Sequence, residues 1–172
     1  RPESGYILPF AWFWGFGAGF MGTMLGPFYA DKGLTLTEFG ILSPISHLAG
    51  STLAAVTTPL LVSRFGLRST AMVGVAILPI EGAMFCMFAL TSLPPLPLLI
   101  VMVSLLGYMT ALFTYPVTIS RYRWASKAQA GTDYALQSSL AGLGVWMAGS
   151  VSGLIASQVG WVYFFPIATT IA

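Results

Sequence analysis

Glu81 is the residue whose chemistry differs most from its surroundings. It lies between Ile80 and Gly82, midway along an apolar stretch of residues 70–90. A carboxylate at the centre of a hydrocarbon layer costs several kcal/mol, so this side chain should face other protein groups rather than lipid. Two roles fit such a position. Glu81 could carry a proton that is coupled to transport, or it could form a structural hydrogen bond to an adjacent helix.

Two other apolar stretches carry polar side chains at helical spacing. Tyr108 and Tyr115 are seven residues apart and therefore share one helix face, with Thr114 beside them. Phenols that face a wet cavity would suit an amphipathic organic ligand, and the alternative is a network of hydroxyls between helices. His47 lies in an earlier stretch, where a neutral imidazole could bind substrate, relay a proton or bond a neighbouring helix.

Soluble-enzyme chemistry has little to work with in this chain. There is no Walker A loop, no paired cysteine spacing, no His-Glu-x-x-His and no nucleophile elbow. Cys86 is the single cysteine, and His47 is the single histidine. We therefore expect no catalytic residues, no metal site and no cofactor. The net charge of +2 is too small to indicate nucleic-acid binding.

The composition identifies the solvent in which these side chains must be placed. Of the 172 residues, 56% are hydrophobic and only 7% are charged, whereas soluble domains have about 25% charged residues. The mean hydropathy is +0.84. So few charges cannot cover the outside of a soluble globule. The sequence therefore predicts an all-α, multi-pass integral membrane protein that is surrounded by a lipid bilayer.

The apolar stretches have the length of membrane-spanning helices. A span needs about 20 mostly apolar residues. Five stretches meet this length and a sixth begins near Trp161: residues 6–30, 40–62, 70–90, 96–119, 134–157 and 161–172. We expect one transmembrane domain over residues 1–172. Since the chain starts at Arg1 and stops inside the sixth stretch, we expect it to belong to a longer protein.

Basic residues predict the orientation of these spans. Only Lys32 falls on one side of the six-span path, and six cations fall on the other: Arg1, Arg64, Arg68, Arg121, Arg123 and Lys127. Cytoplasmic loops collect Lys and Arg, so the N-terminus is predicted to be cytoplasmic.

Three residues near predicted span ends have two interpretations each. Asp133 precedes the fifth span, where a carboxylate stabilises the positive end of a helix or, alternatively, contacts the basic loop as a gate. Gln137 follows it and is a candidate cavity residue. Trp14 lies near a membrane boundary, where tryptophan commonly anchors a helix, and it is also a candidate for the cavity wall.

The connection between the second and third spans resembles a loop motif of the major facilitator superfamily. That motif reads Gly-x-x-x-Asp-Arg-x-Gly-Arg-Arg, and the corresponding stretch here is residues 59–68. Three of its positions are kept, as Arg64, Gly66 and Arg68. Three others are replaced, by Pro59, Ser63 and Leu67. Degenerate copies are common in the second half of such transporters, so the resemblance implies helices seven to twelve.

Two longer stretches are similar to AmpG-like permeases within that superfamily. Residues 25–40 resemble the junction of helices seven and eight, and residues 130–139 resemble the start of helix eleven. That branch contains muropeptide permeases and siderophore importers of the rhizobactin and pyochelin type. The resemblance implies a six-helix half made of two inverted three-helix repeats, with an N-terminal six-helix half as its partner.

The resemblance also implies a function and a location. It implies alternating-access transport of a small organic solute, such as a siderophore or a muropeptide, by proton symport across a bacterial inner membrane. The first and fourth helices of each half line the cavity, which favours Tyr108 and Tyr115 as cavity residues. The third helix is peripheral, which weakens a coupling role for Glu81. Arg64, Gly66, Arg68 and Asp133 would form the cytoplasmic gate. An exporter, a membrane scaffold and an intramembrane enzyme remain alternatives.

Overall fold

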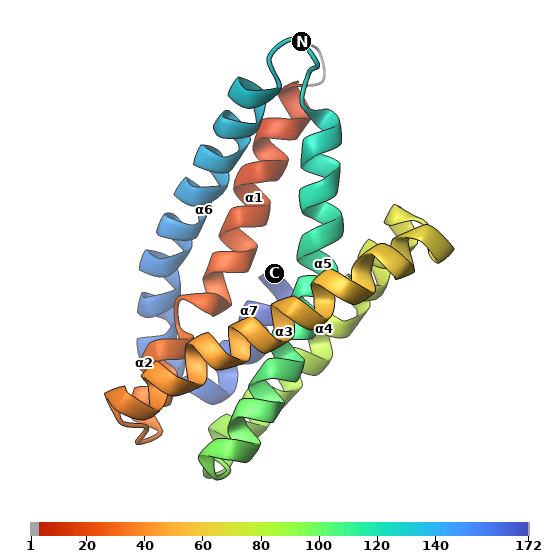
Figure 1. Cartoon of the computed structure of the whole chain (residues 1–172). Helices are drawn as coiled ribbons and strands as arrows, with labels where there is room; N and C mark the ends of the chain where they lie inside the picture. Colours follow the sequence, from red (N-terminus) through yellow and green to blue (C-terminus); the bar gives the residue numbers. More distant parts are fainter. Residues whose placement is uncertain (1–3, 172) are drawn as a thin grey trace. The chain divides into compact units, whose positions relative to one another are not determined.

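Helices account for the regular structure of this protein. A computed structural model describes residues 4–171, which contain no strand. Its elements, shown in Figure 1, are α1 (Ser4–Gly22), α2 (Leu25–Asp31), α3 (Leu36–Phe65), α4 (Leu67–Leu90), α5 (Leu96–Trp124), α6 (Ala130–Val159) and α7 (Trp161–Ile171). The predicted all-α class is confirmed.

Four of the helices are long and apolar enough to cross a membrane, namely α3, α4, α5 and α6. This finding supports an integral membrane protein with transmembrane helices. The α1 helix is outside this set because glycine, tryptophan and Pro9 lower its hydropathy. The α7 helix is apolar and has 11 residues. Spans formed by α1 and α7 therefore stay predictions.

The chain folds into two compact units. Unit 1 is built from the N-terminal stretch up to Leu25 and the C-terminal stretch that begins at Ile119. Unit 2 is the segment between them, Gly26–Thr118. The chain first passes from unit 1 to unit 2 just after a break in the first predicted span, where α1 ends at Gly22 and α2 begins at Leu25. The hydroxyl of Thr23 donates to the Gly19 carbonyl at 2.8 Å, a bond that competes with continued helix formation.

Unit 1 is held by close packing of α1 against α6. A Cβ atom added to Gly19 would lie 2.7 Å from Val145 Cα, and one added to Gly15 would overlap the backbone of Ala141. Since both contacts advance by four residues together, α1 and α6 run in the same direction. The first and fifth spans are predicted to be parallel in this way. Small residues at such contacts let helix backbones approach closely.

Unit 2 packs α5 against both α3 and α4. A Cβ atom on Gly50 of α3 would lie 2.7 Å from the Ser104 carbonyl oxygen, and one on Gly74 of α4 would lie 2.6 Å from Phe113 Cα. Large side chains that are almost fully buried complete this unit, namely Phe28, Tyr29, Leu42, Phe85, Phe88, Leu99 and Leu106.

Local signals set the ends of α3. At its start, Thr35 and Glu38 form a capping box, in which Glu38 N donates to Thr35 Oγ1 at 3.2 Å and Thr35 N donates to Glu38 Oε2 at 2.9 Å. At its end, Gly66 has φ of +83°, a conformation that glycine adopts without a Cβ penalty. A single residue therefore connects α3 to α4, so most of the predicted basic loop is helical.

Candidate functional site

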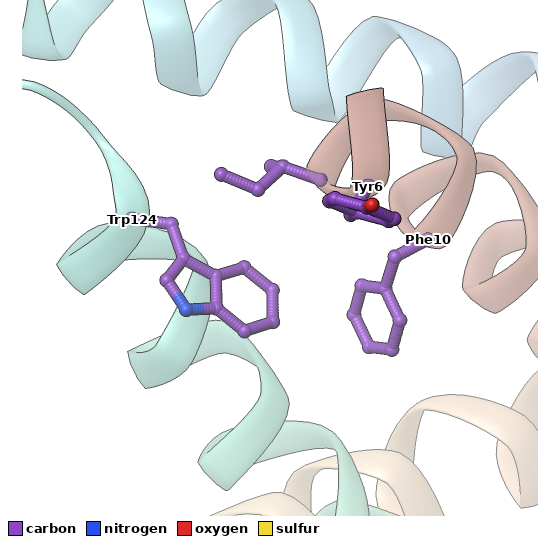
Figure 2. A pocket seen from close by; sticks show the side chains of 4 residues that line it. Tyr6, Phe10 and Trp124 are labelled. Carbon is purple, nitrogen blue, oxygen red and sulfur yellow. The ribbon is translucent and has the colours of Figure 1, made fainter. Parts of the chain in front are cut away.

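An aromatic pocket opens in unit 1 (Figure 2). Its lining residues are Tyr6, Ile7 and Phe10 from α1, together with Trp124 at the end of α5. The pocket has a volume of about 450 Å³. The rings of Phe10 and Trp124 meet edge to face, with centroids 5.3 Å apart. A pocket of this size and lining suits part of a flat apolar or aromatic molecule.

Arg121 lies one helical turn further along the same helices. Its side chain is only 4% exposed, although it carries a permanent positive charge. One nitrogen, Nη2, donates to Ser138 Oγ on α6 at 3.1 Å. Within residues 4–171, the guanidinium forms no ion pair with a carboxylate. Arg121 is thus a buried cation without a matching charge among the described residues.

Two aromatic rings hold the Arg121 guanidinium. Its Cζ lies 5.3 Å from the Trp14 ring centroid and 5.4 Å from that of Tyr134. Tyr134 in turn stacks on Tyr122, with centroids 4.4 Å apart. Such cation–π contacts are worth about 2 kcal/mol when they are desolvated, which offsets part of the cost of burying the charge.

Three polar atoms of unit 1 are buried and have no hydrogen-bond partner within residues 4–171. They are the two donors Arg121 Nε and Trp14 Nε1 and the acceptor Gln137 Oε1. Gln137 is 2% exposed and adjoins Ser138, the residue that Arg121 contacts. A buried polar atom without a partner costs about 1–3 kcal/mol, so this arrangement would be relieved by a polar ligand.

Two of these three residues, Trp14 and Gln137, are candidate cavity residues by sequence. Arg121 is not among the candidates, because the sequence indicates only a loop cation at this position. The α5 helix continues to Trp124, beyond the predicted end at residue 119, and so carries Arg121 into unit 1. A signal was available, since Arg121 lies in the sequence Arg-Tyr-Arg-Trp, where aromatic residues alternate with cations.

The predicted gate residues fall into separate places. Asp133 Oδ2 accepts a hydrogen bond from the Ser126 backbone at 2.8 Å, which fastens the turn before α6. Arg64 and Arg68 are exposed in unit 2, and the Arg64 guanidinium lies over the Phe65 ring. Gly66 makes the turn between them. Their role as a gate stays a prediction.

In unit 2, the tyrosines of α5 bond to α3. The hydroxyls of Tyr108 and Thr57 lie 3.2 Å apart, and the Tyr115 hydroxyl donates to the Ser51 carbonyl at 3.1 Å. Thr114 lies half-buried on the same helix. This geometry is the hydroxyl network between helices that the sequence leaves open as an alternative, and a cavity role for these residues stays a prediction.

Glu81 is buried on α4, with an exposure of 5%. Thr110 Oγ1 lies 2.9 Å from Glu81 Oε2 and 3.2 Å from the Leu106 carbonyl oxygen, and its one proton can serve only one of them at a time. The buried Tyr29 hydroxyl, in the same unit, has no hydrogen-bond partner among the described residues. The structure thus joins Glu81 to protein rather than to lipid.

His47 lies exposed on α3, and no cluster of three metal-ligating side chains occurs in the part of the chain that the structure describes.

Comparison of the chain with protein-family models, with curated proteins and with solved structures gave no match. Membership of the major facilitator superfamily therefore stays a prediction from the residues quoted above.

Proposed function

We propose that this chain is part of a secondary active transporter that moves a small organic solute across a bilayer by alternating access. The observation that carries the proposal is in unit 1, where an aromatic pocket lies one helical turn from Trp14 and Arg121, whose buried Nε1 and Nε atoms have no hydrogen-bond partner among the described residues. Solute and water would supply the missing partners in turn as the site opens to each side of the membrane.

Energetics favour this proposal over a static scaffold. Polar groups inside a bilayer normally find partners within the protein, since lipid provides none. A scaffold gains nothing by keeping Arg121, Trp14 and Gln137 incompletely bonded, whereas a solute site needs donors and acceptors that are free before binding. One observation favours the scaffold, namely that Tyr108 and Tyr115 are already bonded to α3.

The resemblance supplies the wider assembly of the proposed transporter. Helices α1 to α7 would form the C-terminal half of a major-facilitator fold, and an N-terminal six-helix half would supply the opposite wall of the cavity. Trp14 lies on α1 and Arg121 on α5, the helices that would be the first and fourth of that half and would line its cavity. Siderophores and muropeptides are the solutes of the branch that the chain resembles, and the bacterial inner membrane is its location.

A proton is the proposed coupling ion, and Glu81 is its proposed carrier. Its carboxyl group is buried with Thr110 Oγ1 2.9 Å from Oε2, and protonation would turn this acceptor into a group that can also donate a hydrogen bond. The direction of transport is proposed to be import, on the strength of the resemblance, and export is the alternative that flux measurements would distinguish.

Cysteine accessibility in the intact protein tests alternating access. Trp14→Cys and Tyr108→Cys would be introduced separately into a Cys86→Ser background and treated with a membrane-impermeant maleimide from either face. Each should react from one face under one solute gradient and from the other face under the reverse gradient. Trp146→Cys is the matched control, since Trp146 is 82% exposed on α6 and should face lipid throughout. If neither position reacts in any state, transport through this site is refuted.

A further inference from the structure

We infer that unit 1 holds a binding site for a small organic anion that has an aromatic or flat apolar body. The carboxylate or phosphate group would bind Arg121 and Trp14, while the apolar body would occupy the pocket beside Phe10 and Trp124. The inference rests on the proposed transport function insofar as it names this anion as the cargo.

The pocket and the cation are neighbours because they share two helices. Phe10 and Trp14 are four residues apart on α1, and Arg121 and Trp124 are three residues apart on α5. Residues at these spacings lie one turn apart on one helix face. Phe10 and Trp124 meet at the pocket (Figure 2), and one turn further along these two helices the Arg121 guanidinium lies over the Trp14 ring.

The charge of the site selects an anion. Arg121 is 4% exposed, and Asp133, the acidic residue in the first turn of α6, binds the Ser126 backbone through Oδ2. A guanidinium has five N–H donors in a planar fork, and Ser138 takes one of them. The free Nε–H gives an anionic oxygen a charge-assisted hydrogen bond, which is about twice as strong as a neutral one.

Trp14 and Gln137 extend the same site. The Trp14 indole N–H is a second buried donor without a partner, and it belongs to the ring that stacks on Arg121. Gln137 Oε1, next to Ser138 in the sequence, is a buried acceptor without a partner among the described residues, which suits a ligand that also carries a hydroxyl or N–H group. A cationic ligand is disfavoured, because it would meet the unpaired charge of Arg121.

Direct binding to the intact protein tests the inference. The protein would be purified in neutral detergent, and four probes with one phenyl ring would be compared by equilibrium dialysis: phenylacetate, benzyl phosphate, 2-phenylethanol and 2-phenylethylammonium. We expect at least one of the two anions to bind more tightly than the alcohol and the cation by about tenfold or more, the range of a hydrogen bond to a charged group. Which anion binds better distinguishes a carboxylate cargo from a phosphate cargo.

Arg121→Gln and Arg123→Gln form a matched pair of variants. They remove the same charge two residues apart, but Arg123 is exposed while Arg121 is buried. Arg121→Gln should lower anion affinity by about tenfold or more and leave 2-phenylethanol binding unchanged. Arg123→Gln should bind all probes as the unmodified protein does. Equal losses in both variants, or no preference for anions, would overturn the inference.

Trp14→Phe keeps the test decisive if Arg121→Gln does not fold. This variant retains a ring for the guanidinium and removes the indole N–H alone, so anion affinity should fall by a few-fold while alcohol binding persists. Short-chain phosphatidylglycerol tests the competing source of a phosphate group. If it displaces bound phenylacetate at lower concentration than benzyl phosphate does, the site belongs to lipid headgroups and the inference fails.

Binding and transport can fail separately. Dialysis requires no membrane and no gradient, so anion binding without uptake into proteoliposomes would refute the proposed function and leave the site standing. Uptake of a neutral solute without anion binding would refute the inference and leave the proposed function standing.

Discussion

Two glycines of α6 that are two residues apart should respond in opposite ways to the same substitution. A Cβ atom on Gly144 would lie 2.7 Å from Phe16 N, 3.1 Å from Gly15 C and in overlap with the Trp12 carbonyl oxygen. A Cβ atom on Gly142 would have no neighbour within 4 Å. We predict that Gly144→Ala destabilises unit 1 and that Gly142→Ala does not.

The magnitude follows from two opposing terms. Replacing glycine by alanine within a helix gains about 1 kcal/mol of helix propensity at either position. Inserting a methyl group into a filled contact costs about 1–3 kcal/mol. The neighbours of Gly144 are backbone atoms, which cannot rotate away, so the upper end of that range applies. The net change is a loss of about 2 kcal/mol for Gly144→Ala and a gain of up to about 1 kcal/mol for Gly142→Ala.

Unfolding of the intact protein in mixed micelles, followed by circular dichroism as sodium dodecyl sulfate is added, would measure both free energies. The two variants should differ by about 3 kcal/mol. Equal free energies of unfolding would mean that α1 does not approach α6 at this position, and the parallel packing described for unit 1 would then be wrong.

Three further predictions concern unit 2. Thr110→Val should lower the free energy of unfolding by about 2 kcal/mol, because it removes the hydroxyl that donates to the buried carboxyl of Glu81. The loss should be smaller in a Glu81→Gln background, and a double-mutant cycle in the same micelles measures this difference. Thr35→Ala should cost about 1 kcal/mol through loss of the capping box, with the exposed Thr37→Ala as its control in the same unfolding assay. Gly66→Ala should cost about 1 kcal/mol or more, since a Cβ strains a residue with φ of +83°, whereas the exposed helical residue Gly40 should tolerate alanine; thermal unfolding midpoints compare the pair.

Hydropathy was enough to predict the helical class and four helices that are long and apolar enough to span a membrane. The ends of these helices were less predictable, because hydropathy measures how well a side chain suits lipid and not how well it packs against another helix. The fourth span was predicted to end at residue 119, where cations follow, yet α5 continues to Trp124. Arg121 lies against α6 and two aromatic rings rather than in lipid, so the penalty for charge in hydrocarbon does not end the helix there.

Spacing alone also left the helix contacts undetermined. Glycine spacing on the fifth span predicts a contact face with Gly142, Gly149 and Gly153, but the tightest approach of α6 is at Gly144. Periodicity groups residues on one face, while the identity of the facing helix depends on long-range packing that a single sequence does not carry. The break between Gly22 and Leu25 was not predicted, because residues 6–30 contain no charged residue that would mark the end of a span.

The turn at Gly66 limits how this protein can move. One residue connects the last turn of α3 to the first turn of α4. Such a short connection makes α3 and α4 move together as one rigid body. A transport cycle would therefore need to bend the chain elsewhere, for example at the helix break after Gly22. A reporter tag inserted at Gly66 to map membrane sidedness would disrupt the α3–α4 connection. The exposed turn around Lys127 is the better place for such a tag.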